Sequence, residues 1–142
     1  MTLVKKAIPV IALVALAACA TVSDMWSGGK TASVKLSGAE ENPPVKTSAS
    51  GSGSFTLAKD GAVKGSVATT GVQGTMAHIH RGAKGTNGGV ALGLTKNGDT
   101  YSVPDGAKLS EADQAAFKAG TLYVNVHSAA NKGGEIRAQI QP

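Results

Sequence analysis

Leu122-Tyr123-Val124-Asn125-Val126-His127 and Glu135-Ile136-Arg137-Ala138-Gln139-Ile140 are the two segments that decide the fold. In each segment one set of alternate positions is apolar and the other is mostly polar, which is the two-residue period of a β-strand. The turn-forming residues Asn131-Lys132-Gly133-Gly134 lie between them. We therefore predict an antiparallel hairpin, in which His127 lies on the face opposite the apolar side chains.

The sequence before this hairpin has the same character. Asp60-Gly61 and Asn97-Gly98 are turn signals of β-hairpins. A single amphipathic helix is predicted over residues 110–119, with Ser110 as its N-cap and Gly120 after its last turn. These patterns predict an all-β fold, an antiparallel β-sandwich or flattened barrel with one short helix. The other predicted strands cover residues 33–37, 51–57, 62–69, 75–80, 89–95 and 101–103.

Composition excludes several classes of protein. The chain has 142 residues, of which 42% are hydrophobic and 16% are charged, and this balance is typical of one globular domain and not of disorder. The formal net charge is +5, but the cations are dispersed and aromatic residues are few. A nucleic-acid interface needs clustered cations, so we expect no nucleic-acid partner.

The N-terminus has the pattern of an export signal. Lys5 and Lys6 precede a short apolar run, which ends at Ala18 and is too short to span a bilayer. Leu16-Ala17-Ala18-Cys19 resembles the bacterial lipobox, and Cys19 is the only cysteine. We therefore predict a signal peptide over 1–18, a lipidated Cys19 with a tether over 19–31, and a folded domain over 32–142. The alternative is an ordinary signal peptide followed by a chance cysteine.

Lipidation at Cys19 would anchor the protein on the periplasmic side of the bacterial cell envelope. The next residue is Ala20 and not the aspartate that resembles an inner-membrane retention signal, so the outer membrane is favoured. Trp26 lies in the tether, where it would pack on the domain or sit at the lipid interface. The sequence does not decide between these two positions.

The three histidines carry the chemical interest. His78 and His80 share one face of the predicted strand, with about 6.6 Å between them along the strand. If the polar face of the segment ending in His127 meets that strand, three imidazoles form one site. Three imidazoles suit Cu(II), Zn(II) or Ni(II). The alternative is that these histidines form hydrogen bonds with the backbone or lie exposed.

Two further residues are candidates for the same site. Met76 shares the face of His78 and His80, and its thioether is a soft ligand, although core packing would also explain it. Glu135 lies next to the predicted His127 strand and is a candidate hydrogen-bond partner for a ligand histidine. The alternative for Glu135 is a salt bridge or a solvated charge.

From residue 34 to residue 141 the chain resembles the CHRD domain, named from its occurrence in chordin. The resemblance implies an immunoglobulin-like or superoxide-dismutase-like β-sandwich, in a family whose bacterial members are commonly exported or lipid-anchored. It rests on four motifs in the right order and spacing, which are Leu36-Ser37-Gly38-Ala39-Glu40-Glu41-Asn42-Pro43-Pro44-Val45, Ala77-His78-Ile79-His80-Arg81-Gly82, Leu122-Tyr123-Val124-Asn125-Val126-His127-Ser128 and Gly133-Gly134-Glu135-Ile136-Arg137-Ala138.

The His-x-His motif also resembles the copper-binding strand of Cu/Zn superoxide dismutases. Three histidines are too few for the two-metal site of that family, and its paired cysteines are missing here. A mononuclear site of His78, His80 and His127 is what this sequence can build. The affinity order of divalent ions favours copper, with zinc as the second candidate.

The sequence therefore predicts a lipid-anchored copper-binding protein that acts in copper handling or sequestration. Two other functions stay open at this stage. One is a structural or interaction module of the cell envelope, in which the histidines hold loops. The other is a mononuclear copper enzyme that acts on superoxide or another small oxidant, so enzymatic activity is undecided.

Overall fold

The computed structural model describes residues 26–142. The predicted signal peptide, Cys19 and the first part of the tether lie outside these residues. Trp26 contacts the domain, because the ammonium group of Lys64 lies 4.1 Å from the centre of its ring. The first strand begins at Lys30, so the last two residues of the predicted tether belong to the sheet. Within the described part of the chain, no helix has the length and hydropathy of a membrane span.

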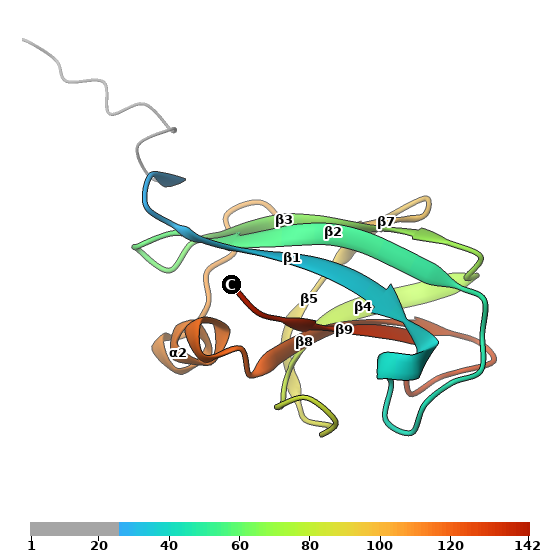
Figure 1. The fold of residues 1–142 in the computed structure, drawn as a ribbon. Helices are drawn as coiled ribbons and strands as arrows, with labels where there is room; N and C mark the ends of the chain where they lie inside the picture. Colours follow the sequence, from blue (N-terminus) through green and yellow to red (C-terminus); the bar gives the residue numbers. More distant parts are fainter. Residues whose placement is uncertain (1–25) are drawn as a thin grey trace, which may run out of the picture.

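The fold is all-β, as predicted, and its strands form one sheet (Figure 1). Neighbouring strands are antiparallel, in the order β5-β4-β8-β9-β1-β2-β3-β7-β6. A 3-10 turn, η1 (Gly38–Glu40), follows the first strand. The strands are β1 (Lys30–Ser37), β2 (Ser50–Leu57), β3 (Val63–Thr70), β4 (Gly74–Arg81), β5 (Val90–Gly93), β6 (Thr95–Asn97), β7 (Thr100–Ser102), β8 (Leu122–Ser128) and β9 (Ile136–Ile140).

The sheet curls into a nearly closed barrel, and Leu94 is the residue that joins its two edges. β5 and β6 lie at opposite ends of the strand order, yet Leu94 alone separates them in the chain. Its backbone N–H donates to the carbonyl of Ala77 in β4 over 3.0 Å. The prediction of a single strand over 89–95 was therefore wrong, because the chain changes from one edge of the sheet to the other within this segment.

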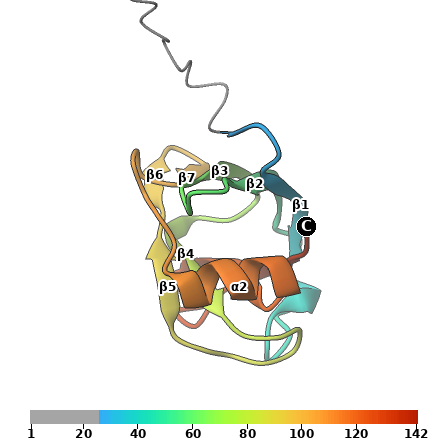
Figure 2. The ribbon, with the colours of Figure 1, turned by 90° about the vertical axis from the view of Figure 1, so that its left-hand side faces the viewer.

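The predicted helix is present as α2 (Glu111–Ala119), and it lies across one end of the barrel (Figure 2). The Ser110 hydroxyl accepts a hydrogen bond from the Asp113 N–H, and Gly120 ends the helix with φ of 71°. Phe117 is fully buried in the core. Arg81, the last residue of β4, forms two hydrogen bonds of 2.6 and 2.8 Å to the Asp113 carboxylate, which attach the helix to that strand.

The core lies inside the barrel, and β8 is buried on both of its faces. Val124 and Val126 pack inward, where neither is exposed. The outward side chains of β8 are also buried, and Asn125 retains only 2% of its exposed surface. The outer face of this part of the sheet is therefore covered by polypeptide, and the histidines lie there.

Candidate metal centre

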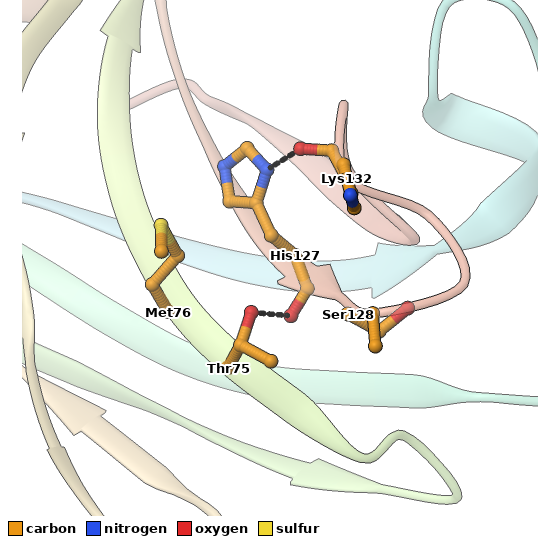
Figure 3. A pocket seen from close by; sticks show the side chains of 6 residues that line it. Thr75, Met76, His127, Ser128 and Lys132 are labelled. Carbon is orange, nitrogen blue, oxygen red and sulfur yellow. Dashed lines mark hydrogen bonds between the residues drawn. The ribbon is translucent and has the colours of Figure 1, made fainter.

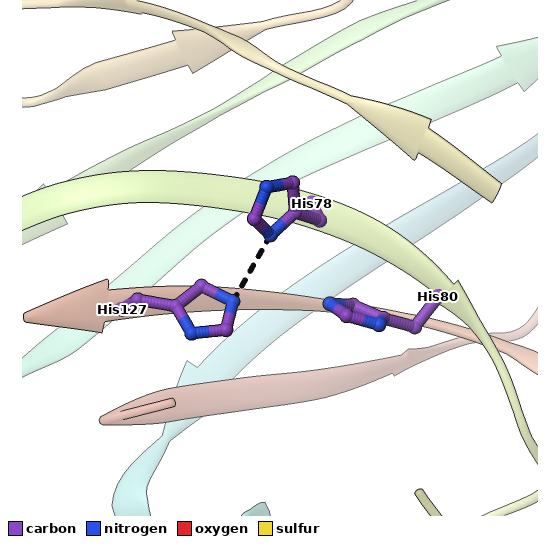
Figure 4. A group of neighbouring side chains, drawn as sticks. All are labelled: His78, His80 and His127. Atoms are coloured by element: carbon purple, nitrogen blue, oxygen red, sulfur yellow. Dashed lines mark hydrogen bonds between the residues drawn. The ribbon is translucent and has the colours of Figure 1, made fainter. Parts of the chain in front are cut away.

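Strand pairing between β4 and β8 assembles the site. Met76 lies opposite His127, and His80 lies opposite Tyr123. Side chains on a strand alternate between its faces, so Met76, His78 and His80 all project to the outer face of β4, where His127 projects from β8. Figure 4 shows the three histidine rings turned toward one another over the two strands.

The three rings are close enough to share one ion. One nitrogen from each of His78, His80 and His127 can be chosen so that all three lie within 4.8 Å of one another. Within this group, His78 Nδ1 and His127 Nε2 are 3.1 Å apart. The structure thus brings together the three residues that the sequence singled out.

Backbone carbonyls determine the tautomer of two of the rings. His80 Nδ1 lies 3.0 Å from the Gly88 carbonyl oxygen, and His127 Nδ1 lies 2.8 Å from that of Lys132. A carbonyl can only accept, so in each neutral ring Nδ1 carries the proton and Nε2 carries the lone pair. His80 Nε2 is buried and has no hydrogen bond of good geometry among the described residues, although the Asn125 side chain lies near enough to raise the pKa of His80 slightly against the effect of burial. A buried unpaired nitrogen is costly, and a bound metal ion would remove that cost.

The spacing fits a metal ion with imidazole ligands. Two nitrogens bound at 2.0–2.1 Å with a tetrahedral angle lie about 3.3–3.4 Å apart. The 3.1 Å separation of His78 Nδ1 and His127 Nε2 is close to this value, and a ring nitrogen of His80 lies within 4.8 Å of both. His78, His80 and His127 therefore fit a three-coordinate nitrogen site that leaves room for another ligand.

Burial keeps two of these histidines neutral. Desolvation lowers the pKa of His78 below its ordinary value of 6.5, and the neighbouring rings of His127 and His80 lower it further. Desolvation is also the main cause of the lowered pKa of His80. Because a protonated imidazole cannot bind a metal, the lowered pKa values keep the lone pairs available near neutral pH.

The ring of Tyr123 stacks against one face of the His80 ring. The rings of His80 and Tyr123 are parallel within 6°, with their centres 5.0 Å apart. On its other face Tyr123 meets the guanidinium carbon of Arg137 at 3.4 Å from the ring centre. The Tyr123 hydroxyl accepts a hydrogen bond of 3.3 Å from the Gly88 N–H. The backbone of Gly88 is therefore bound on both sides, its carbonyl by His80 and its N–H by Tyr123.

Arg137 holds the segment that covers this face, the loop of residues 82–89. Its guanidinium donates to the Asn87 side chain and to the carbonyls of Ala83 and Thr86, over 2.8 to 3.3 Å. Arg137 is only 1% exposed. The sequence pattern does not predict this role, since a polar residue that alternates with apolar ones on a strand normally faces solvent. The glycine-rich character of residues 82–89 was the available signal that a loop could fold closely over it.

The two additional candidates lie in different surroundings. The Glu135 carboxylate accepts a hydrogen bond of 2.9 Å from the Thr47 hydroxyl, and hydrogen bonding with Ser128, above all, lowers its pKa. Glu135 was a candidate partner for a ligand histidine, but the Nδ1 atoms of His80 and His127 meet the carbonyls of Gly88 and Lys132 instead. Met76 is 50% exposed, so packing in the core does not explain it.

An open pocket of about 340 Å³ lies beside His127, and Met76 is part of its wall (Figure 3). In this view the Met76 sulfur lies on the side of the His127 ring away from Lys132, which is the side of Nε2. The remaining lining residues are Thr75, Ser128, Ala129 and Lys132. Of the three histidines, only His127 lines this pocket, and Met76 lies beside it in the same wall.

A comparison with protein families matches residues 32–140 to the CHRD domain. Searches among curated proteins and among solved structures gave no match. The matched range includes all nine strands apart from the first two residues of β1, together with the three histidines. The chain therefore belongs to the CHRD domain family.

Proposed function

We propose that the protein binds one copper ion through His78, His80 and His127 and serves in copper handling or sequestration. The observation that carries this proposal is the buried Nε2 of His80, which has no hydrogen bond of good geometry among the described residues although the Gly88 carbonyl fixes its lone pair toward the cluster. A ring held in this way without a ligand would cost folding free energy. A histidine that served only to hold a loop would need just its Nδ1 bond.

Copper is the ion that this donor set favours. All three donors are neutral nitrogens, and among divalent first-row ions their affinity is highest for copper. Zinc is the second candidate, because three histidines with one open position also suit Zn(II).

The proposed place of action is the periplasmic side of the cell envelope. The support is the N-terminal sequence, where two lysines and a short apolar run precede Cys19. Two or more acyl chains at that cysteine would give a stable membrane anchor. The test is mass spectrometry of the protein purified from membranes, in which a mass without acyl chains on Cys19 would contradict the anchor.

Metal titration of the purified full-length protein tests the copper site. His78→Ala is the best variant, because the His78 ring donates to no backbone carbonyl among the described residues and its removal releases no loop. We expect Cu(II) to bind one-to-one to the wild type, and we expect His78→Ala to weaken binding by about 100-fold or more.

Lys132→Ala is the matched control, because it keeps the backbone carbonyl that orients His127. Its copper affinity should equal that of the wild type. Unchanged affinity in His78→Ala would overturn the proposal and would favour the structural alternative, in which the histidines only hold the loops over β4 and β8.

A further inference from the structure

Met76 occupies an unusual position for a large apolar residue. In the described part of the chain it is one of two large hydrophobic side chains that are strongly exposed, and the other is Val90 at 48%. It lies directly opposite His127 in the β4–β8 pair. Exposure of so much apolar surface costs free energy, and neither the core nor the barrel closure requires a methionine there.

Met76 lies beside one member of the histidine cluster, His127. Met76 and His127 both line the same open pocket, whose exposed surface is mainly carbon. Figure 3 shows the sulfur on the same side of the His127 ring as Nε2, the nitrogen that carries the lone pair and lies 3.1 Å from His78 Nδ1. Because Met76 is also paired directly with His127 across the two strands, its flexible side chain can reach a metal ion bound to Nε2.

The donors on this face are all neutral, and one of them is soft. The nearest carboxylate in sequence, Glu135, is engaged by Thr47, and the ring N–H groups of His80 and His127 donate to carbonyls and not to carboxylates. Glu135 and the hydrogen-bond partners of His80 and His127 therefore provide no anionic ligand for a doubly charged ion. Thioether sulfur is a ligand that selects Cu(I).

We infer, on the basis of the proposed copper site, that the ion held here is Cu(I) and that the Met76 thioether is its fourth ligand. His78, His80 and His127 supply three nitrogens, and Met76 closes the site on its open side. The site then favours Cu(I) over Cu(II), because a thioether sulfur selects Cu(I). Removal of the sulfur should therefore weaken Cu(I) binding more than Cu(II) binding.

The experiment compares Met76→Leu with the wild type. Leucine keeps the apolar bulk of this exposed position and removes only the sulfur. Cu(I) affinity is measured by anaerobic competition with a Cu(I) chelator, and Cu(II) affinity is measured by aerobic competition. We expect Met76→Leu to weaken Cu(I) binding by about tenfold or more and to leave Cu(II) binding within about twofold. A tenfold loss for Cu(I) alone lowers the Cu(II)/Cu(I) reduction potential by about 59 mV.

Val90→Leu is the matched control, because Val90 is equally exposed on the neighbouring strand β5, and both copper affinities should be unchanged. X-ray absorption of the Cu(I)-loaded wild type should show a sulfur ligand that is missing in Met76→Leu. Equal Cu(I) affinities of wild type and Met76→Leu, or a Cu(I) spectrum without sulfur, would overturn the inference while the three-histidine site remained. Unchanged copper binding in His78→Ala would instead overturn the proposed function itself.

Discussion

The imidazoles of His78 and His80 are held neutral by their surroundings, and this has a consequence for stability. Burial is the main cause of the lowered pKa of both rings. In the unfolded chain each ring binds a proton as the pH falls below the ordinary value of 6.5, whereas in the folded chain it does so only at lower pH. The unfolded state thus binds more protons in this range and is favoured by acid.

We therefore expect the free energy of unfolding of the metal-free protein to decrease between about pH 7 and about pH 5. The contribution of the two neutral histidines to the free energy of unfolding is complete above pH 6.5. It is lost as the pH falls toward the lowered pKa values of the folded chain. Urea denaturation across this range measures the effect, and His78→Asn should make the dependence shallower.

Glu41 contributes to the pH dependence of stability with a sign opposite to that of His78 and His80. The substitution Glu41→Gln separates the two contributions. Burial raises its pKa above 4.5, so the folded chain takes up this proton first and gains stability as the pH falls. Glu41→Gln removes that contribution and should leave a steeper loss of stability on acidification. A Glu41→Gln protein with constant stability between pH 7 and pH 5 would show that His78 and His80 are not held neutral.

At the scale of elements, the loop of residues 82–89 controls the position of His80. Gly88 approaches the backbone so closely that a β-carbon there would collide with the Arg81 carbonyl oxygen. Only glycine allows this approach. The close approach brings the Gly88 carbonyl within hydrogen-bond distance of His80 Nδ1. Gly89, the next residue, has open space where its β-carbon would be.

This difference makes Gly88→Ala and Gly89→Ala a matched pair. We expect Gly88→Ala to displace the loop, to cost about 1–3 kcal/mol of folding free energy and to weaken metal binding, because His80 loses its orienting carbonyl. We expect Gly89→Ala to change stability by no more than about 0.5 kcal/mol. Thermal denaturation and metal titration of both variants check this. Equal metal affinity of the two variants would mean that the loop does not position His80.

At the scale of the whole molecule, the site exists only in the folded barrel. His127 comes from a strand 49 residues away from His78 in the chain, and the loops that orient the rings come from two further segments. An ion that needs all three rings binds the folded state and not the unfolded chain. Metal binding should therefore add directly to stability.

Copper at about 100 times its dissociation constant should raise the free energy of unfolding by about 2.7 kcal/mol. Chelation of the metal should return the protein to its original stability. Denaturation with and without copper measures this increment, and His78→Ala should abolish it. An increment of the same size in His78→Ala would show that the stabilising ion binds elsewhere.

Local patterns predicted most of the strands and failed where the chain crosses the molecule. The hairpin over residues 122–140 and the helix after Ser110 follow from alternation, turn residues and caps, which are local properties. The segment 89–95 reads as one strand, because nothing local shows that Leu94 passes from one edge of the sheet to the other. Arg137 reads as exposed, because its cover is a loop from a distant part of the chain.

For the site, the sequence by itself determined the donors and their faces. A two-residue period puts His78 and His80 on one side of β4, and three histidines limit the site to one ion. Only the tertiary structure decided that β4 pairs with β8, that carbonyls and not Glu135 orient the rings, and that Met76 lies exposed beside His127. The reason is physical: the face of a side chain depends on its own strand, whereas its neighbours depend on how distant strands pair to bury the whole core.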